Sequence, residues 1–311
     1  MKILLVILII IIVLSLIVAY GTYRMGFYWD RTSQRDPLRL DENEYAPYND
    51  LMISQVKKIL AVPYEKVYIT SKDGLKLFAK YYHKSDDAPV EIMVHGYHAV
   101  AERDFPFALK FAFERGHNVL LIDQRSHGES EGHTVCFGVK EREDVLLWSE
   151  YIVKRLGPNV KILLSGVSMG SATVMMATAL PLPKNVVGVI ADCGYTSPED
   201  IIKLVTPAMV PIPVNVIYPF VKLGALIFGH FSITAASAIE AMQTIKLPIL
   251  FIHGENDTFV PFYMVNELYD ACNSPKKYIY TVKNAPHARS TFEDYEGCAR
   301  KMDEFMTEIG I

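Results

Sequence analysis

Apolar and polar positions along the chain follow two periods, one typical of β-strands and the other of α-helices. Short runs such as 160–164 are rich in Val, Ile and Leu and predict strands buried on both faces, whereas 139–157 has the spacing of an amphipathic helix. Asp73-Gly74 separates two alternating segments and predicts a β-hairpin. Strands that alternate with helices predict an α/β fold, with a mostly parallel central sheet and helices on both faces. Further strands are predicted at 90–96, 118–123, 186–194, 247–254 and 276–282.

The first strongly apolar stretch, Ile3 to Tyr20, carries no charged residue. Its 18 residues span about 27 Å as a helix, close to the roughly 30 Å of a hydrocarbon core. A cleaved signal peptide is the alternative, but its apolar region is usually shorter, and Ile17 is a poor small residue three positions before a cut at Ala19. The segment therefore predicts a retained single-pass anchor in the cell membrane. The aromatic residues around its end predict an interfacial belt: Tyr20, Tyr23, Phe27, Tyr28 and Trp29.

The charges on either side of this apolar segment bear on its orientation. Lys2 precedes it and four arginines follow it, which favours a cytoplasmic main domain by the positive-inside rule. That rule weakens for long domains. The sequence therefore leaves open which side of the membrane carries the main domain.

Composition and periodicity divide the chain into five segments. The anchor and its aromatic residues make up 1–30, and a polar linker with a short helix follows at 31–63. The α/β core is predicted at 64–194 and resumes at 247–311. Between these two parts, 195–246 interrupts the alternation of strands and helices as an insertion.

Composition excludes some classes of function. Half of the 311 residues are hydrophobic, which is enough for a sizeable core, and the net charge of −4 gives no electrostatic case for nucleic-acid binding. The four cysteines lie far apart, and the histidines show no paired ligand spacing. We therefore expect no metal site, no disulfide framework and no bound cofactor.

A serine flanked by two glycines follows one of the predicted strands. The segment 166–170, Gly-Val-Ser-Met-Gly, lies between strand 160–164 and a helix that Pro181 closes. In a sheet of this type, active sites gather at the carboxyl ends of the strands. Three other strand ends carry groups suited to acid–base chemistry: His95 with Gly96, Tyr97 and His98; Glu255 and Asp257; and His287.

Together these motifs resemble the serine α/β-hydrolase superfamily over about residues 66–308, and are most similar to bacterial esterases, monoacylglycerol lipases and serine-aminopeptidase-like proteins. The resemblance implies that Ser168 is the nucleophile, His287 the general base and Asp257 the acid that orients it. The family pattern H-G-x-x-D-x-x-V-P favours Asp257 over Glu255. The motifs that carry the likeness are "HGYHA", "DQRSHGES", "GVSMGSA", "HGENDTFVP" and "NAPH".

The chemistry of acyl transfer explains why these residue types are needed together. A serine hydroxyl is a weak nucleophile that needs an adjacent imidazole to take its proton, and a carboxylate fixes the tautomer of that imidazole. The oxyanion of the tetrahedral intermediate needs two donors, for which the resemblance implies the backbone N–H groups of Tyr97 and Met169. Four residues are expected to support the site structurally: His95, Gly96, Gly166 and Gly170.

The insertion at 195–246 falls where this superfamily places its cap. From Ile201 to Gly229 only Lys203 and Lys222 are charged, and its prolines break the stretch too often for a second transmembrane helix. Its apolar residues either pack the cap onto the core or form a lid that shapes an acyl pocket and dips into the bilayer. The sequence leaves both interpretations open.

The sequence therefore predicts a serine hydrolase that cleaves a carboxylic ester with an apolar acyl group, a small-molecule substrate, through an acyl-enzyme. The bilayer is its other expected partner, through residues 3–20. A peptidase, a thioesterase or an acyltransferase would use the same three residues and remains an alternative. A non-catalytic scaffold with the same fold is the other alternative, but a scaffold would not need Ser168, Asp257 and His287 together. The sequence gives neither the natural substrate nor the oligomeric state.

Overall fold

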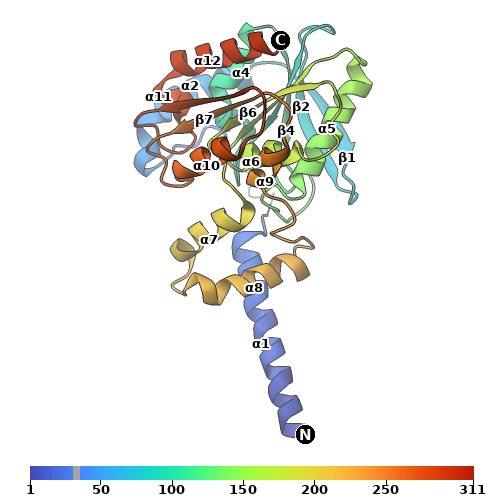
Figure 1. Cartoon of the computed structure of the whole chain (residues 1–311), viewed down its shortest axis with the longest axis vertical. Coiled ribbons are helices and arrows are strands. Elements are labelled where there is room, and N and C mark those ends of the chain that lie inside the picture. Colours follow the sequence, from blue (N-terminus) through green and yellow to red (C-terminus); the bar gives the residue numbers. More distant parts are fainter. Residues whose placement is uncertain (31–35) are drawn as a thin grey trace.

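The computed structural model describes residues 1–30 and 36–311. Figure 1 shows an α/β body from which one long helix, α1 (Lys2–Gly26), projects. Two helices of the insertion, α7 (Pro198–Met209) and α8 (Val214–Ile227), lie between the body and the free end of α1. The insertion therefore covers the end of the body from which α1 projects.

The body is built on an eight-stranded sheet in the order β1-β2-β4-β3-β5-β6-β7-β8. The hairpin of β1 and β2 is antiparallel, β2 also pairs antiparallel with β4, and every remaining pair is parallel. This arrangement confirms the mostly parallel sheet predicted from the alternation of strands and helices. The strands are β1 (Glu65–Thr70), β2 (Lys76–Tyr82), β3 (Val90–Val94), β4 (Asn118–Asp123), β5 (Ile162–Val167), β6 (Val186–Asp192), β7 (Ile249–Gly254) and β8 (Lys277–Val282).

Helices cover both faces of the sheet, as the uniformly apolar strands require. Successive side chains of a strand point to opposite faces, so Ile92 and Met93 of β3 belong to different apolar clusters. One face is covered by α5 (Glu141–Leu156), α6 (Met169–Ala177), α9 (Ala238–Thr244) and α10 (Tyr263–Ala271). The other is covered mainly by α2 (Asn49–Leu60), α4 (Pro106–Glu114) and α12 (Tyr295–Glu308).

Two segments differ from the structure that their sequence pattern predicts. The helical pattern at about 102–116 is split into α3 (Ala101–Asp104) and α4 around Phe105, because Pro106 has no N–H to continue the helix. The described part of 31–63 contains a 3₁₀ helix, η1 (Asn43–Tyr48), followed by α2, which packs against α3 and α4. The segment 36–60 is therefore part of the packed body.

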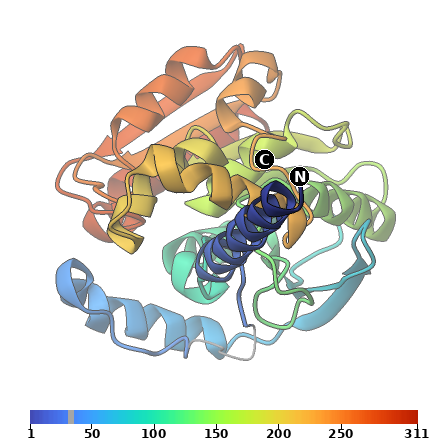
Figure 2. The same cartoon turned by 90° about the horizontal axis from the view of Figure 1, so that it is seen from below.

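Among the described residues, α1 is the one helix long and apolar enough to cross a membrane by itself. Its first 18 residues are largely exposed, whereas its end packs against α8, as Figures 1 and 2 both show. Gly224 of α8 permits this close approach, since a Cβ there would lie 2.4 Å from the carbonyl oxygen of Ala19. Thr22 Oγ1 donates a hydrogen bond to the carbonyl of Phe220 at 3.1 Å.

The end of α1 corrects the expected interfacial aromatic belt at two of its five residues. Tyr23 and Phe27 are buried inside the protein, where Phe27 contacts Phe137 and Phe231 with ring centroids 5.7 and 5.3 Å apart. The helix extends to Gly26, so one face of its last turns meets α8 and the body rather than lipid headgroups. The end of this helix is therefore continuous with the apolar core.

Candidate active site

Ser168 lies at the sharp turn between β5 and α6, with φ of +56° and ψ of −118°. This strained conformation presents the hydroxyl above the carboxyl edge of the sheet. The flanking glycines are required by close backbone contacts. A Cβ at Gly170 would lie 1.8 Å from the carbonyl oxygen of Val94, and one at Gly166 would lie 2.3 Å from the carbonyl oxygen of Gly170. The glycine–serine pattern is therefore explained by local packing.

A chain of hydrogen bonds joins the three residues that the sequence singles out. Nε2 of His287 lies 2.9 Å from Oγ of Ser168, and Nδ1 of His287 lies 2.7 Å from Oδ2 of Asp257. An ionised carboxylate only accepts, so Nδ1 carries the proton and Nε2 accepts the hydrogen bond from the serine hydroxyl. This is the protonation state in which imidazole can take the serine proton.

The position of Asp257 is fixed by its own loop. Its Oδ1 accepts hydrogen bonds from the backbone N–H groups of Phe259 and Val260 at 2.9 and 2.8 Å, and its side chain is fully buried. Burial by itself would raise the pKa of this carboxyl, but hydrogen bonds from His253 and His287 outweigh that effect and lower the pKa to about 2. Glu255 instead accepts a hydrogen bond from the Thr281 hydroxyl at 2.9 Å.

His253 is a member of this network that the sequence did not indicate. It is fully buried at the end of β7, where Nε2 donates to the carbonyl of Val260 at 2.9 Å and lies 3.4 Å from Oδ2 of Asp257. The carboxylate thus has an imidazole on two sides. The "HGENDTFVP" motif contains this histidine, and only the folded loop shows that it turns back onto Asp257.

The loop after β3 approaches Ser168 from the other side. His95 is fully buried, with Nδ1 donating to the carbonyl of Gly96 at 2.8 Å and Nε2 accepting from the N–H of Gln124 at 3.0 Å. Burial lowers the pKa of His95 to about 4, so the ring is neutral and holds the loop in place. Gly96 N–H donates to Asp104 Oδ2 at 2.6 Å. Tyr97 and Met169, the expected oxyanion donors, line one cavity with Ser168.

Cys193 lies beside the same hydrogen-bonded chain. Its Sγ, together with ligand atoms of Asp257 and His287, forms a group within 4.8 Å, close enough to hold a metal ion. Both Asp257 and His287 are already engaged in the hydrogen bonds described above, and burial raises the pKa of the Cys193 thiol well above its usual range. The protonated thiol is a poor metal ligand, so the chemistry of this donor set does not favour a metal site.

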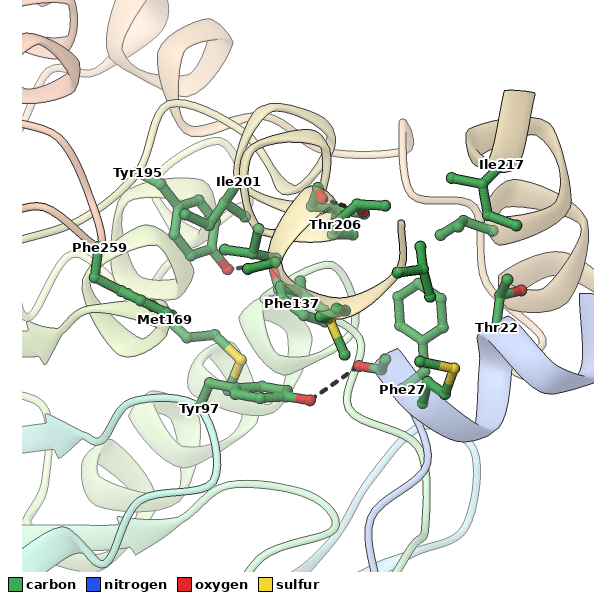
Figure 3. A pocket seen from close by; sticks show the side chains of 18 of the residues that line it. Thr22, Phe27, Tyr97, Phe137, Met169, Tyr195, Ile201, Thr206, Ile217 and Phe259 are labelled. Carbon is green, nitrogen blue, oxygen red and sulfur yellow. Dashed lines mark hydrogen bonds between the residues drawn. The ribbon is translucent and has the colours of Figure 1, made fainter. Parts of the chain in front are cut away.

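An apolar cavity of about 270 Å³ opens directly onto Ser168. Its walls come from the cap helices α7 and α8 and from the end of α1, as Figure 3 shows. The hydroxyl of Tyr97 donates to the carbonyl of Gly26 at 3.1 Å and so connects the loop after β3 to α1. The sequence did not indicate that the end of α1 and the residue after it line this wall. The lining residues from this segment are Thr22, Met25, Gly26 and Phe27.

A second cavity, of about 320 Å³, lies on the other side of Ser168 and is lined by His287. The two cavities share Tyr97, Ser168 and Phe259, so they meet at the serine hydroxyl. A substrate that reaches from one cavity into the other would place its scissile bond there. The site is thus a bipartite cleft centred on Ser168.

Comparisons with known proteins agree with the fold. A family model described as the α/β hydrolase fold matches residues 92–216, and one described as a serine hydrolase matches 158–285. The Pyrococcus furiosus esterase Pf2001 superposes with a TM-score of 0.66 and 22% sequence identity, over 88% of this chain and 99% of that one. This similarity shows that the two proteins share a fold.

Two curated relatives were also found. The uncharacterized protein YqkD of Bacillus subtilis is 25% identical over 62% of this chain, and the match spans 63% of that relative's own length. The lysophosphatidylserine lipase ABHD12 of Danio rerio is 29% identical over 64% of this chain and 51% of its own length. Both relatives are therefore matched over part of their length.

Proposed function

Because the chain belongs to the α/β-hydrolase family, we propose that it is a membrane-anchored serine esterase that cleaves a carboxylic ester through Ser168, His287 and Asp257. The observation that carries this proposal is the hydrogen-bonded chain from the Ser168 hydroxyl through His287 to the buried Asp257 carboxylate. A hydroxyl, an imidazole and a carboxylate in this order are the parts that acyl transfer requires.

The reaction follows from the roles of these groups. Oγ of Ser168 attacks the ester carbonyl as Nε2 of His287 takes its proton, and Asp257 stabilises the resulting imidazolium. The N–H groups of Met169 and Tyr97 stabilise the oxyanion. His287 then gives the proton to the leaving alcohol as the C–O bond breaks, which leaves the acyl group on Ser168. Water, deprotonated by His287, attacks this acyl-enzyme and releases the carboxylic acid and the free serine.

The apolar cavity supports an acyl chain as the group held during this reaction. It includes Met169, which follows the nucleophile, and it is lined by apolar side chains such as Ile201, Val205 and Met209 of α7. Because α1 forms part of the wall, a lipid substrate would bind next to the membrane anchor. The zebrafish relative is named as a lipase, which supports the same class of substrate.

The anchor and the cap support a position of this cavity at the membrane surface. Residues 2–18 project from the body as an exposed apolar helix, and α8 crosses α1 just beyond them. The cap also exposes apolar side chains, including Met209, Ile212 and Val216. Such a surface suits contact with lipid acyl chains.

The test is a series of p-nitrophenyl esters from acetate to laurate, hydrolysed by the full-length protein in a non-ionic detergent. Each methylene buried is worth about 0.8 kcal/mol, so kcat/KM should rise by up to roughly fourfold per methylene until the cavity is full. Val205→Phe should shorten the optimal chain by filling the cavity. Leu204→Phe is the matched control, since Leu204 is exposed on the same helix and lies outside the lining.

Two results would contradict this proposal. In the first, kcat/KM would fall steeply from acetate to longer esters, which would mean that the cap covers the body without binding an acyl chain. Equal shortening by Val205→Phe and Leu204→Phe would place the acyl chain elsewhere.

A further inference from the structure

The second cavity beside Ser168 is lined by three arginines that the catalytic steps do not use. Arg39 precedes η1, Arg103 belongs to α3, and Arg289 lies two residues after His287. They come from three separate parts of the chain and face the same cavity of about 320 Å³. Such convergence of guanidinium groups in one hollow points to an anionic ligand.

One carboxylate is shared among these three cations. Asp41 Oδ2 accepts hydrogen bonds from Arg103 at 2.6 Å and from Arg289 at 3.1 Å, and Asp41 Oδ1 lies 3.8 Å from Arg39. The other carboxyl that lines the cavity, Asp104, is fully buried and accepts the N–H of Gly96, and burial raises its pKa. The cavity therefore keeps an excess of positive charge.

Some of the donor capacity in this cluster is unused. Arg289 is more than nine-tenths buried, yet its Nε has no hydrogen-bond partner among the described residues, and the same holds for Nε of Arg39. A buried donor without a partner is costly, because it has lost water without gaining an acceptor. Both guanidinium groups line the cavity, so a bound oxyanion would offer them further acceptors.

The position of His287 assigns this cavity to one half of the substrate. His287 must pass its proton to the leaving alcohol, and it lines the arginine cavity but not the apolar one. The leaving alcohol therefore belongs on the arginine side, and the acyl chain on the apolar side.

We propose that the cavity lined by Arg39, Arg103 and Arg289 binds an anionic group of the phosphate class, carried by the alcohol part of the ester. The substrate is then a single-chain acyl lipid with an anionic head group. This proposal rests on the esterase function proposed above. In the step concerned, the ester C–O bond breaks, Nε2 of His287 gives its proton to the departing oxygen, and the phosphate-bearing alcohol leaves with its negative charge unchanged.

Arg39 is the best position for a test, because it is partly exposed and its contact with Asp41, at 3.8 Å, is the longest of the three arginine contacts to that carboxylate. Arg103, in contrast, also holds the carbonyls of Pro37 and Arg39, so its loss would disturb the segment itself. Arg300, exposed on α12, provides a matched control far from the cavity.

The experiment compares lauroyl-lysophosphatidylglycerol with monolauroylglycerol, which share the acyl chain, using the full-length protein in a non-ionic detergent. We expect kcat/KM to be at least tenfold higher for the anionic lipid. Arg39→Gln and Arg289→Gln should each lower this ratio about tenfold, Arg39→Lys should lower it less, and Arg300→Gln should leave it unchanged. Inorganic phosphate, tested as an inhibitor of p-nitrophenyl ester hydrolysis, separates recognition of the anion alone from recognition of the whole lipid.

Distinct outcomes separate the two proposals. If the wild type hydrolyses both lipids at equal rates, or if its preference survives in Arg39→Gln and Arg289→Gln, the anionic subsite is wrong while the esterase stands. If neither lipid nor any p-nitrophenyl ester is cleaved, the esterase function fails and the subsite fails with it. Inhibition by phosphate that persists in both arginine variants would place the anion elsewhere.

Discussion

At the scale of single residues, backbone strain is concentrated around the candidate site. Four non-glycine residues near it have positive φ: His98, Ser168, Cys193 and Ala288. Each follows the carboxyl end of a strand, where the chain must turn sharply to present a side chain or an N–H group above the sheet. Such conformations cost roughly 1–3 kcal/mol each, and they persist because the surrounding packing over-determines them.

The identity of the acid is a residue-scale prediction. Asp257→Asn should lower kcat by a factor on the order of 10⁴, because an amide at this position no longer holds the required tautomer of His287. Glu255→Gln is the matched control, and it should stay within about tenfold of wild type, since Glu255 contacts Thr281 instead. Hydrolysis of a p-nitrophenyl ester measures both. A larger loss in Glu255→Gln would transfer the role to that residue.

Asp192 gives a prediction about pH and stability. It ends β6, and burial raises its pKa to about 7, with His253 opposing the shift. A carboxyl whose pKa is raised by folding favours the folded state while protonated, so its contribution is full below about pH 4 and is lost as pH rises to about 7. The free energy of unfolding should therefore fall across this window by roughly 2 to 4 kcal/mol.

Asp192→Asn should remove that part of the pH dependence, because the amide does not ionise. Denaturant unfolding of the full-length protein in detergent, at pH 5 and pH 8, measures the difference. Asp270→Asn, an exposed position on α10, serves as the control and should follow the wild type. The interpretation is wrong if Asp192→Asn loses as much stability as the wild type between these two pH values.

At the scale of elements, most strands and helices follow from periodicity alone. The strand predicted at 118–123 coincides with β4, and the helix predicted at 139–157 contains α5, because their apolar positions face neighbours on a regular element. The end of α1 was not predictable in this way. Tyr23 and Phe27 read as interfacial aromatics in the sequence, and their partners in α8 and the body lie far along the chain.

The crossing of α1 and α8 can be tested at one glycine. Gly224→Ala should lower the stability of the full-length protein by about 1–3 kcal/mol, since its Cβ would lie 2.4 Å from the carbonyl oxygen of Ala19. Gly21→Ala is the matched control, because nothing lies within 4 Å of the added Cβ and alanine favours the helix. Thermal unfolding in detergent compares the two variants. Equal stability would show that the helices do not pack as closely as described.

At the scale of the whole molecule, α1, the insertion and the body together line the two cavities that meet at Ser168. The sequence predicts these parts separately, together with the three residues at their centre. It does not show that α1 lines the apolar cavity or that Arg39, Arg103 and Arg289 converge on the second one. Those relations join residues more than sixty positions apart, so no local sequence pattern predicts them. A version lacking residues 1–30 would lose part of the cavity wall.

The most direct test of the proposed chemistry is covalent labelling of the full-length protein with a fluorophosphonate, followed by mass spectrometry of its peptides. The wild type should carry one adduct on Ser168, because the His287–Asp257 pair activates that hydroxyl. Ser171→Ala, one turn further along α6, is the matched control and should label as the wild type does. Ser168→Ala should not label. Stoichiometric labelling of Ser168→Ala, or a wild-type adduct on another residue, would contradict the mechanism.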